Sequence, residues 1–160
     1  MKSQFLSRGA ALVAVMTVLA APAFSETVEG SGSCHAIAGT FSTNLGVVDQ
    51  NTSLGSVTGD LRGAVAATIL NVTQNSDGTV SFLVQHHLVT ETGDTITFDL
   101  ATAVAVPLSP TLFAVRSYPV HINGGTGRYA KTRGDFTNIG EVDLGSGKAV
   151  FRYTGHLCST

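Results

Sequence analysis

Three side chains of this chain that can hold or donate protons, His86, Arg116 and Tyr118, are predicted to face its interior. His86 lies in the segment 79–90, whose other even-numbered positions are mostly apolar. Arg116 and Tyr118 lie in the segment 112–122, where they share the even-numbered positions with leucine, valine and isoleucine. An imidazole titrates near neutral pH, and a guanidinium or a phenol donates hydrogen bonds. We therefore predict that His86, Arg116 and Tyr118 are candidate catalytic residues, which polarise or protonate an oxygen atom of an apolar ligand.

Apolar side chains in the same alternating pattern are predicted to surround these groups. In the segment 95–106 the larger apolar residues occupy the even-numbered positions. Alternate residues of each strand point into a β-barrel. We predict that the residues in contact with the ligand are Phe82, Phe98, Leu100 and Tyr153. The cavity that they line is expected to measure on the order of a few hundred Å³, the usual size of a ligand site.

A different interpretation of the polar residues stays open. A buried guanidinium must be paired, because an unpaired buried charge is strongly destabilising. Arg116 would then lie at the barrel surface or at a subunit contact, paired with Glu141 or Asp99. His86 would be hydrogen-bonded within the barrel wall.

The sequence offers no ligand set for a metal ion. Its 2 cysteines and 5 histidines lack the close spacings of metal-binding motifs. His86 and the adjacent His87 point to opposite faces of a strand, so they cannot serve one site. We expect neither a metal ion nor another cofactor.

The elements that must position these residues are predicted to be β-strands. Turn signals at Asp77-Gly78, 91–94 and 144–147 separate runs of alternating polarity, and no run has the period of an amphipathic helix. Seven strands are predicted at 34–43, 57–72, 79–90, 95–106, 112–122, 133–143 and 148–157, and an eighth between 46 and 61. This pattern predicts an all-β protein, a single eight-stranded antiparallel up-and-down barrel.

A glycine-rich segment, 123–134, separates two of these strands. Its spacing also matches the G-x-x-G-x-x-A turn of dinucleotide-binding proteins, but that turn requires a helix after it, and residues 132–143 alternate as a strand does. The segment instead resembles the corresponding part of the dirigent and allene oxide cyclase-like barrel superfamily. The matching residues are Gly124, Gly125, Thr126, Gly127, Tyr129, Arg133 and Gly134. We expect this motif to be structural, with Tyr129 closing one end of the barrel.

The resemblance carries its own expectations about fold and activity. It implies an eight-stranded antiparallel barrel of the calycin or allene oxide cyclase-like kind, often trimeric, with an apolar pocket for a small organic molecule. Members of the superfamily steer the ring closure or stereochemistry of reactive intermediates without a metal or cofactor. None of their catalytic carboxylates can be matched to a residue of this chain.

The first 25 residues are predicted to be a secretory signal peptide. Lys2 and Arg8 precede an uncharged apolar run, and small residues then offer a cleavage site. Residues 26–160 would form the barrel domain, secreted or periplasmic. In such an oxidising compartment we expect Cys34 and Cys158 to form a disulfide, although two free thiols stay an alternative.

Charge and composition restrict the partners. Lys and Arg total 9 and Asp and Glu total 11, and the basic residues form no patch, so neither nucleic acid nor, after removal of the signal, a membrane is an expected partner. Three functions stay open: a cofactor-free cyclase or isomerase, a binding protein for a small hydrophobic ligand, or a structural or interaction barrel with a packed interior. Each is compatible with a homotrimer.

Overall fold

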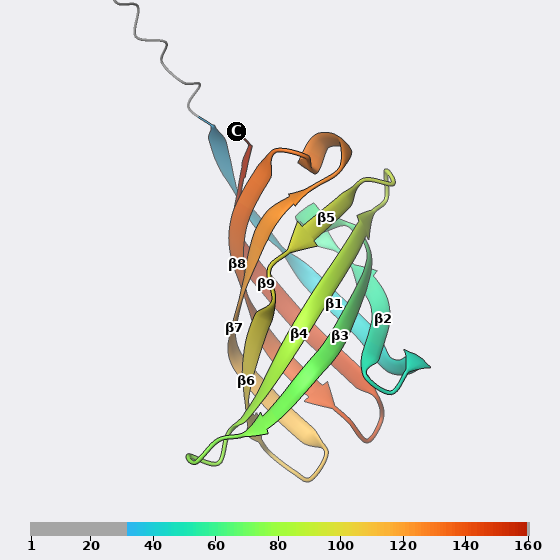
Figure 1. The fold of residues 1–160 in the computed structure, drawn as a ribbon, viewed down its shortest axis with the longest axis vertical. Coiled ribbons are helices and arrows are strands. Elements are labelled where there is room, and N and C mark those ends of the chain that lie inside the picture. Colours follow the sequence, from blue (N-terminus) through green and yellow to red (C-terminus); the bar gives the residue numbers. More distant parts are fainter. Residues whose placement is uncertain (1–31, 160) are drawn as a thin grey trace, which may run out of the picture.

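The chain folds almost entirely into β-strands (Figure 1). The computed structural model describes residues 32–159, and the predicted signal peptide, 1–25, lies outside that range. Within the described range the strands are β1 (Ser33–Asp49), β2 (Thr52–Val57), β3 (Gly63–Gln74), β4 (Val80–Thr90), β5 (Thr95–Phe98), β6 (Ala101–Pro107), β7 (Leu112–Gly125), β8 (Thr132–Asp143) and β9 (Lys148–Ser159). Two short 3-10 helices, η1 (Gly59–Leu61) and η2 (Gly127–Tyr129), lie between strands.

The strands close into a single antiparallel barrel. Apart from β5 and β6, each strand pairs with the strand before and after it in the chain, and β9 returns to pair with β1 along its whole length. β5 and β6 share the place between β4 and β7, one after the other, so the nine strands occupy eight positions around the barrel. The predicted eight-stranded up-and-down barrel is confirmed, and the eighth strand, β2, lies where it was expected.

The turns follow from residues that accept unusual backbone angles. Gly78 and Gly93 have φ angles of +83° and +86°, which glycine adopts without steric cost. The side chain of Asp77 accepts hydrogen bonds from the backbone and hydroxyl of Thr79, which fixes the β3–β4 turn. The sequence signals for these two hairpins are therefore confirmed.

Three predicted strands differ in extent from the observed ones. β1 continues through residues 44–49, which pair with β2 and with the start of β9. The predicted strand 57–72 begins only at Gly63, after η1. The predicted strand 95–106 is interrupted at 99–100, between β5 and β6.

The two ends of the barrel differ. The end that carries η1 and η2 is filled by large, fully buried side chains, among them Leu61, Leu88, Ile96 and Tyr153. The Tyr153 hydroxyl accepts a hydrogen bond from the backbone nitrogen of Leu61 at 2.9 Å and donates one to the Thr58 carbonyl oxygen at 3.0 Å. The opposite end carries the turns β1–β2, β3–β4, β6–β7 and β8–β9 (Figure 1).

A disulfide joins the first strand to the last. Cys34 and Cys158 are direct partners in the β1–β9 pairing and form a disulfide across a sequence separation of 124 residues. The predicted bond is confirmed, and no described cysteine is free. Disulfides of this kind are typical of proteins that fold in an oxidising compartment.

The glycine-rich segment forms a close turn at the filled end. Gly125 ends β7 so near to β5 that a Cβ atom there would lie 2.0 Å from the Thr95 carbonyl oxygen. The guanidinium of Arg133 donates hydrogen bonds to the carbonyl oxygens of Asn123 and Thr132. Tyr129 is buried in η2. Strand β8, rather than a helix, follows the turn.

In the part of the chain that the structure describes, no helix has the length and apolarity needed to cross a membrane.

Candidate functional site

An apolar cavity occupies the half of the barrel opposite the end that carries η1 and η2. Its volume is about 90 Å³, which is smaller than the few hundred Å³ expected. Nearly all of its surface comes from aliphatic and aromatic side chains. Residues from every wall of the barrel line it: Phe41, Thr43, Leu45, Ser53, Val65, Ala67, Ile69, Phe82, Val84, His86, Phe98, Ala103, Val115, Tyr118, Phe136, Asn138, Val142, Gly147, Lys148, Ala149 and Phe151.

The cavity extends along part of the length of the barrel. On β4 its lining runs from Phe82 to His86, four residues apart, or about 13 Å of strand. Lys148, at the start of β9, is exposed and marks the mouth. His86, Tyr118 and Asn138 lie further from that end of the strands, and the hydroxyl residues Thr43 and Ser53 also line the cavity.

His86 and Tyr118 form a hydrogen-bonded pair in this cavity. The Tyr118 hydroxyl lies 2.7 Å from His86 Nε2, and the two ring centroids are 5.6 Å apart. Burial, with a smaller contribution from the adjacent His87, lowers the pKa of His86 to about 4. Burial also raises the pKa of Tyr118. Both side chains are therefore uncharged at neutral pH.

Asn138 adds a third polar side chain, which the sequence reasoning missed. It is 3% exposed, and its Nδ2 donates a hydrogen bond to the Tyr118 carbonyl oxygen at 3.3 Å. Among the described residues no protein group hydrogen-bonds to Asn138 Oδ1 or to His86 Nδ1, although both atoms are buried. Two residues that line the cavity thus each carry one buried polar atom without a partner in the described structure.

A signal for Asn138 exists in the sequence, but it is incomplete. Asn138 shares its alternating phase with Phe136 and Val142, so it belongs to the inward face of β8. Its position beside Tyr118 depends on the register between β7 and β8, in which these two residues are direct partners. That register depends on the bulge in β7, whose position the alternation does not fix.

Aromatic rings hold the polar pair in place. Phe98 contacts His86 edge-on with ring centroids 5.9 Å apart, and it contacts Phe136 in the same way at 6.0 Å. Phe151 packs against Tyr118 at 6.0 Å. Phe82 and Phe98 therefore lie on the cavity wall where the sequence predicted a ligand contact, although no ligand shows whether they make one.

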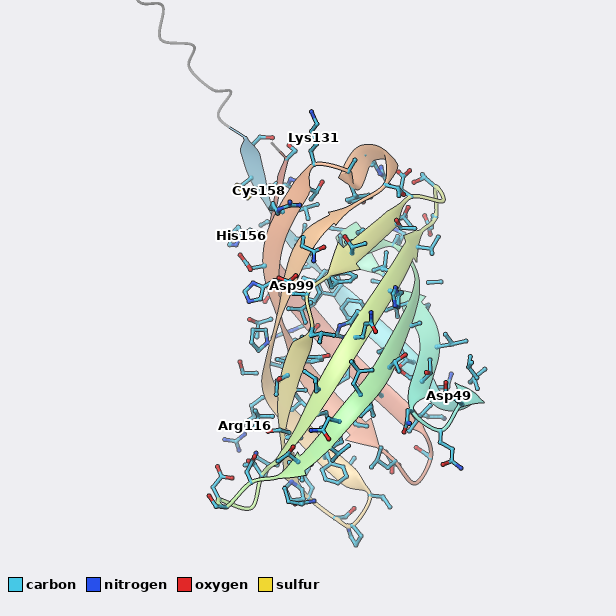
Figure 2. All side chains as sticks on the ribbon, in the orientation of Figure 1. Asp49, Asp99, Arg116, Lys131, His156 and Cys158 are labelled. Carbon is cyan, nitrogen blue, oxygen red and sulfur yellow. A yellow bond between two sulfur atoms is a disulfide. The ribbon has the colours of Figure 1, made fainter. Side chains whose placement is uncertain are left out.

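Arg116 lies on the outside of the barrel, so its predicted inward orientation is wrong. Along β7 the inward positions are odd up to Val115 and even from Tyr118 onward. The pairing explains this change: β7 advances three residues from Val115 to Tyr118 while β8 retreats only two, from Gly140 to Asn138. The extra residue is a bulge, which shifts the phase of the strand. Figure 2 shows Arg116 projecting from the barrel wall.

The alternative interpretation, in which Arg116 lies at the surface and pairs with Glu141 or Asp99, is correct only in part. The residue is at the surface, as that interpretation requires, but among the described residues it forms no ion pair with Glu141 or Asp99. Asp99 instead accepts a hydrogen bond from Asn123 at 2.6 Å.

Leu100 is also outside the cavity, contrary to its predicted role. Its side chain is 54% exposed, in the interruption between β5 and β6. From Thr97 to Ala101 the chain advances four residues, whereas the partner strand β4 spans only three, from His87 to Val84. The extra residue reverses the phase, so that the alanines of β6 face inward and Val104 faces outward.

Tyr153 points inward but does not line the cavity. It is fully buried, and both hydrogen bonds of its hydroxyl go to the backbone beside η1. Its predicted role as a ligand contact is therefore not supported by its position. Tyr153 closes the filled end of the barrel. The ring of Phe41, which lines the cavity, packs against the Tyr153 ring with the two centroids 4.9 Å apart.

Residues 32–159 contain no group of three or more histidine, cysteine or carboxylate side chains placed to hold a metal ion. The one charged side chain on the cavity lining, Lys148, lies at its mouth. The interior can therefore provide shape, apolar contact and uncharged hydrogen bonds.

Comparison with known proteins gives likenesses to solved structures alone. No protein-family model matches the sequence, and no curated protein matches it. The solved structure of the pterocarpan synthase dirigent protein GePTS1 is similar, with 16% sequence identity and a TM-score of 0.36 over 87% of this chain and 97% of that chain.

Proposed function

We propose that the barrel binds a small, mainly apolar organic molecule that carries one uncharged hydrogen-bonding group at its inner end. The observation that carries this proposal is the cavity itself, whose lining is almost wholly aliphatic and aromatic and includes a few uncharged polar residues, among them His86, Tyr118 and Asn138. A ligand in this cavity buries its own apolar surface, which is the main source of affinity in such sites.

The electrostatics of the cavity favour an uncharged ligand group. His86 and Tyr118 are neutral at pH 7, and Asn138 carries no charge, so an ionised group beside them would be desolvated without a counter-ion. An apolar cavity of about 150 Å³ binds benzene in another protein. At about 90 Å³ this cavity is smaller than that, so a ligand that carries a ring would extend toward the mouth at Lys148.

Steering of a cyclisation or isomerisation is a second candidate function for the same cavity. A narrow apolar channel restricts the conformers of a flexible substrate and excludes water, which favours ring closure. The His86–Tyr118 pair supports this function less well as an acid or base, because burial moves the pKa of each group away from neutrality. Any acceleration would therefore come mainly from conformational restriction.

We also propose that the protein acts outside the cytoplasm, as a secreted or periplasmic protein. The Cys34–Cys158 disulfide supports this location, and so does the apolar N-terminal segment of the sequence.

A titration of the disulfide-bonded protein with benzyl alcohol and with toluene tests the binding function. The two probes share a ring and differ by a hydroxyl group. We expect saturable shifts of the NMR signals from the methyl groups of Val65, Val84 and Val115, with tighter binding of benzyl alcohol. Shifts that do not saturate, or that occur only on residues outside the cavity, would refute the proposal.

A further inference from the structure

We propose that the open end of the barrel, which carries the turns β1–β2, β3–β4, β6–β7 and β8–β9, docks on the surface of a zwitterionic phospholipid layer and takes its ligand from there. This inference rests on the proposed binding function and adds to it the source of the ligand. It concerns side chains outside the cavity lining, so it can be tested separately from binding inside the cavity.

Large apolar side chains are exposed at the open end. Val47 and Val48, near the end of β1, are 62% and 64% exposed, and Leu108, in the β6–β7 turn, is 62% exposed. Leu144 in the β8–β9 turn and Leu70 in β3 are exposed as well. We call these five residues the apolar rim.

The turns at the filled end lack such residues. Among the described residues, the turns 58–62, 91–94 and 126–131 carry no exposed large apolar side chain, and their own Leu61 and Tyr129 are buried. Single exposed apolar residues are ordinary, whereas a group of them in one place marks an interaction site. The asymmetry between the two ends therefore identifies the open end as a contact surface.

Backbone hydrogen bonds connect the turns that carry the apolar rim, which lie together at one end of the barrel (Figure 1). They join the β8–β9 turn to the β6–β7 turn, β1 to the β8–β9 turn, and β3 to the β1–β2 turn. The three bonds are Leu144 N to Thr111 O at 2.9 Å, Leu45 N to Gly147 O at 2.5 Å, and Ile69 N to Asn51 O at 2.9 Å.

The apolar rim adjoins the mouth of the cavity. Leu45 lines the cavity, and Val47 and Val48 follow it two and three residues later. Leu144 belongs to the same turn as Gly147, which also lines the cavity. A ligand that enters the cavity on this side therefore passes beside exposed apolar side chains rather than through open water.

The charges at the open end indicate which kind of surface it fits. The turns contain three aspartates, Asp49, Asp77 and Asp143, against one lysine, Lys148. Each aspartate accepts hydrogen bonds within its own turn. A second copy docked end to end would bring these carboxylates against their own kind and would close both cavities. An anionic lipid surface would repel them in the same way.

A zwitterionic phospholipid surface meets both features of this end. Its ammonium groups are cations that lie at the depth of the headgroups, and an apolar side chain gains free energy when it enters the boundary below them. The lipid is also a fluid in which an apolar ligand dissolves, so contact leaves the cavity accessible. The lack of a basic patch, from which the sequence predicted no membrane partner, excludes an anionic surface and not this one.

A fluorescent side chain can report the contact directly. The chain contains no tryptophan, so Val48→Trp introduces a single reporter at the apolar rim. When phosphatidylcholine vesicles are added to the disulfide-bonded protein, we expect its emission to shift to the blue. Val89→Trp, at an exposed position near the filled end, is the matched control and should not shift. No shift at position 48, or equal shifts at both positions, would overturn the proposal.

Co-sedimentation with vesicles measures the strength of docking. Val47→Ser/Val48→Ser should weaken partitioning onto phosphatidylcholine vesicles about tenfold or more, and Val89→Ser should stay within about twofold of wild type. All three side chains are exposed, so the variants are expected to fold. Vesicles that also contain phosphatidylglycerol should bind no more tightly. Tighter binding to them would assign the contact to basic residues and overturn the proposal.

The outcomes separate docking from binding in the cavity. Without vesicles, Val47→Ser/Val48→Ser should bind benzyl alcohol as wild type does, because neither residue lines the cavity. A protein that binds benzyl alcohol but no vesicles would overturn docking and leave the binding function intact. One that binds vesicles but no benzyl alcohol would overturn the binding function and, with it, the uptake of ligand from lipid. Dimers that form through the apolar rim in place of vesicle binding would overturn lipid docking in favour of a second copy.

Discussion

At the scale of single residues, His86 links the cavity to the stability of the protein. Its imidazole lies among aromatic rings and receives one hydrogen bond, and its pKa is lowered to about 4. In an unfolded chain the same group has a pKa near ~6.5. Folding therefore releases a proton from His86 at mildly acidic pH, which makes stability depend on pH there.

The pH dependence gives a first prediction. Neutral His86 contributes to the free energy of unfolding, and this contribution is fully present above about pH 6.5. It is lost as pH falls toward 4, because the unfolded chain then binds a proton that the folded chain does not. Over this window we expect the free energy of unfolding to fall by up to about 3 kcal/mol, as measured by urea unfolding at a series of pH values.

Two substitutions at adjacent positions make this test specific. His86→Gln should flatten the dependence between pH 4 and 6.5, and His87→Gln, at the exposed neighbour, should leave it unchanged. Asp49, Asp77 and Asp143 also have lowered pKa values, from hydrogen bonds in their own turns, but their contribution is lost only below about pH 4. An unaltered slope in His86→Gln would contradict the account.

Of the side chains chosen from the sequence, those on unbroken strands were oriented correctly. Phe82 and His86 lie on β4. Every β4 residue from Val80 to Thr90 has a partner on β3, with no extra residue on β4, and both side chains face the cavity. The hydrogen bond between His86 and Tyr118 was not predictable, because it joins strands whose registers are not visible in the sequence.

At the scale of strands, two single-residue insertions decide which side chains reach the cavity. One lies between β5 and β6 and the other in β7, and each reverses the alternation beyond it. The sequence of 112–122 contained a trace of this reversal, since Phe113 and Val115 are apolar in the odd positions while Tyr118 and Val120 are apolar in the even ones. Alternation assigns faces reliably only as far as the next bulge.

The bulge in β7 gives a second prediction. Arg116→Ala should change the free energy of unfolding by less than about 0.5 kcal/mol and leave ligand affinity unchanged, because the side chain is exposed. The neighbouring Val115→Ala, at a buried position, should cost about 2 kcal/mol. Guanidinium chloride unfolding measures both. A large loss of affinity in Arg116→Ala would restore the original catalytic assignment.

The seam between β1 and β9 gives a third prediction. The Cys34–Cys158 disulfide joins the two strands that close the barrel and restricts the unfolded chain over a separation of 124 residues. The double variant Cys34→Ser/Cys158→Ser should therefore unfold with about 2–5 kcal/mol less free energy than the oxidised protein. Wild type unfolded in excess reducing agent is the matched control. Equal unfolding midpoints for oxidised and reduced protein would contradict this role.

At the scale of the whole molecule, the barrel is divided into a filled half and a hollow half. η1, η2 and Tyr153 close one end, while residues at the end of β1 and around the β8–β9 turn line the mouth of the cavity at the other. Sequence patterns predicted the barrel, its strand count and its disulfide, because these follow from alternation, turn residues and cysteine placement. The small size of the cavity was not predictable, because it depends on how far each aromatic ring extends across the interior.

The central claim is that a ligand occupies the hollow half, and filling that space tests it. Ala67 faces the cavity, and the adjacent Ala66 faces outward beside His87 on β4. Ala67→Leu should fill the cavity without loss of thermal stability, since leucine occupies space that is already open. Ala66→Leu makes the same change outside the barrel.

The most direct measurement is the dissociation constant of benzyl alcohol for wild type, Ala67→Leu and Ala66→Leu by NMR titration. We predict that Ala67→Leu weakens binding about tenfold or more, and that Ala66→Leu stays within about twofold of wild type. Equal affinity in all three proteins would show that the probe binds elsewhere and would contradict the cavity as the functional site.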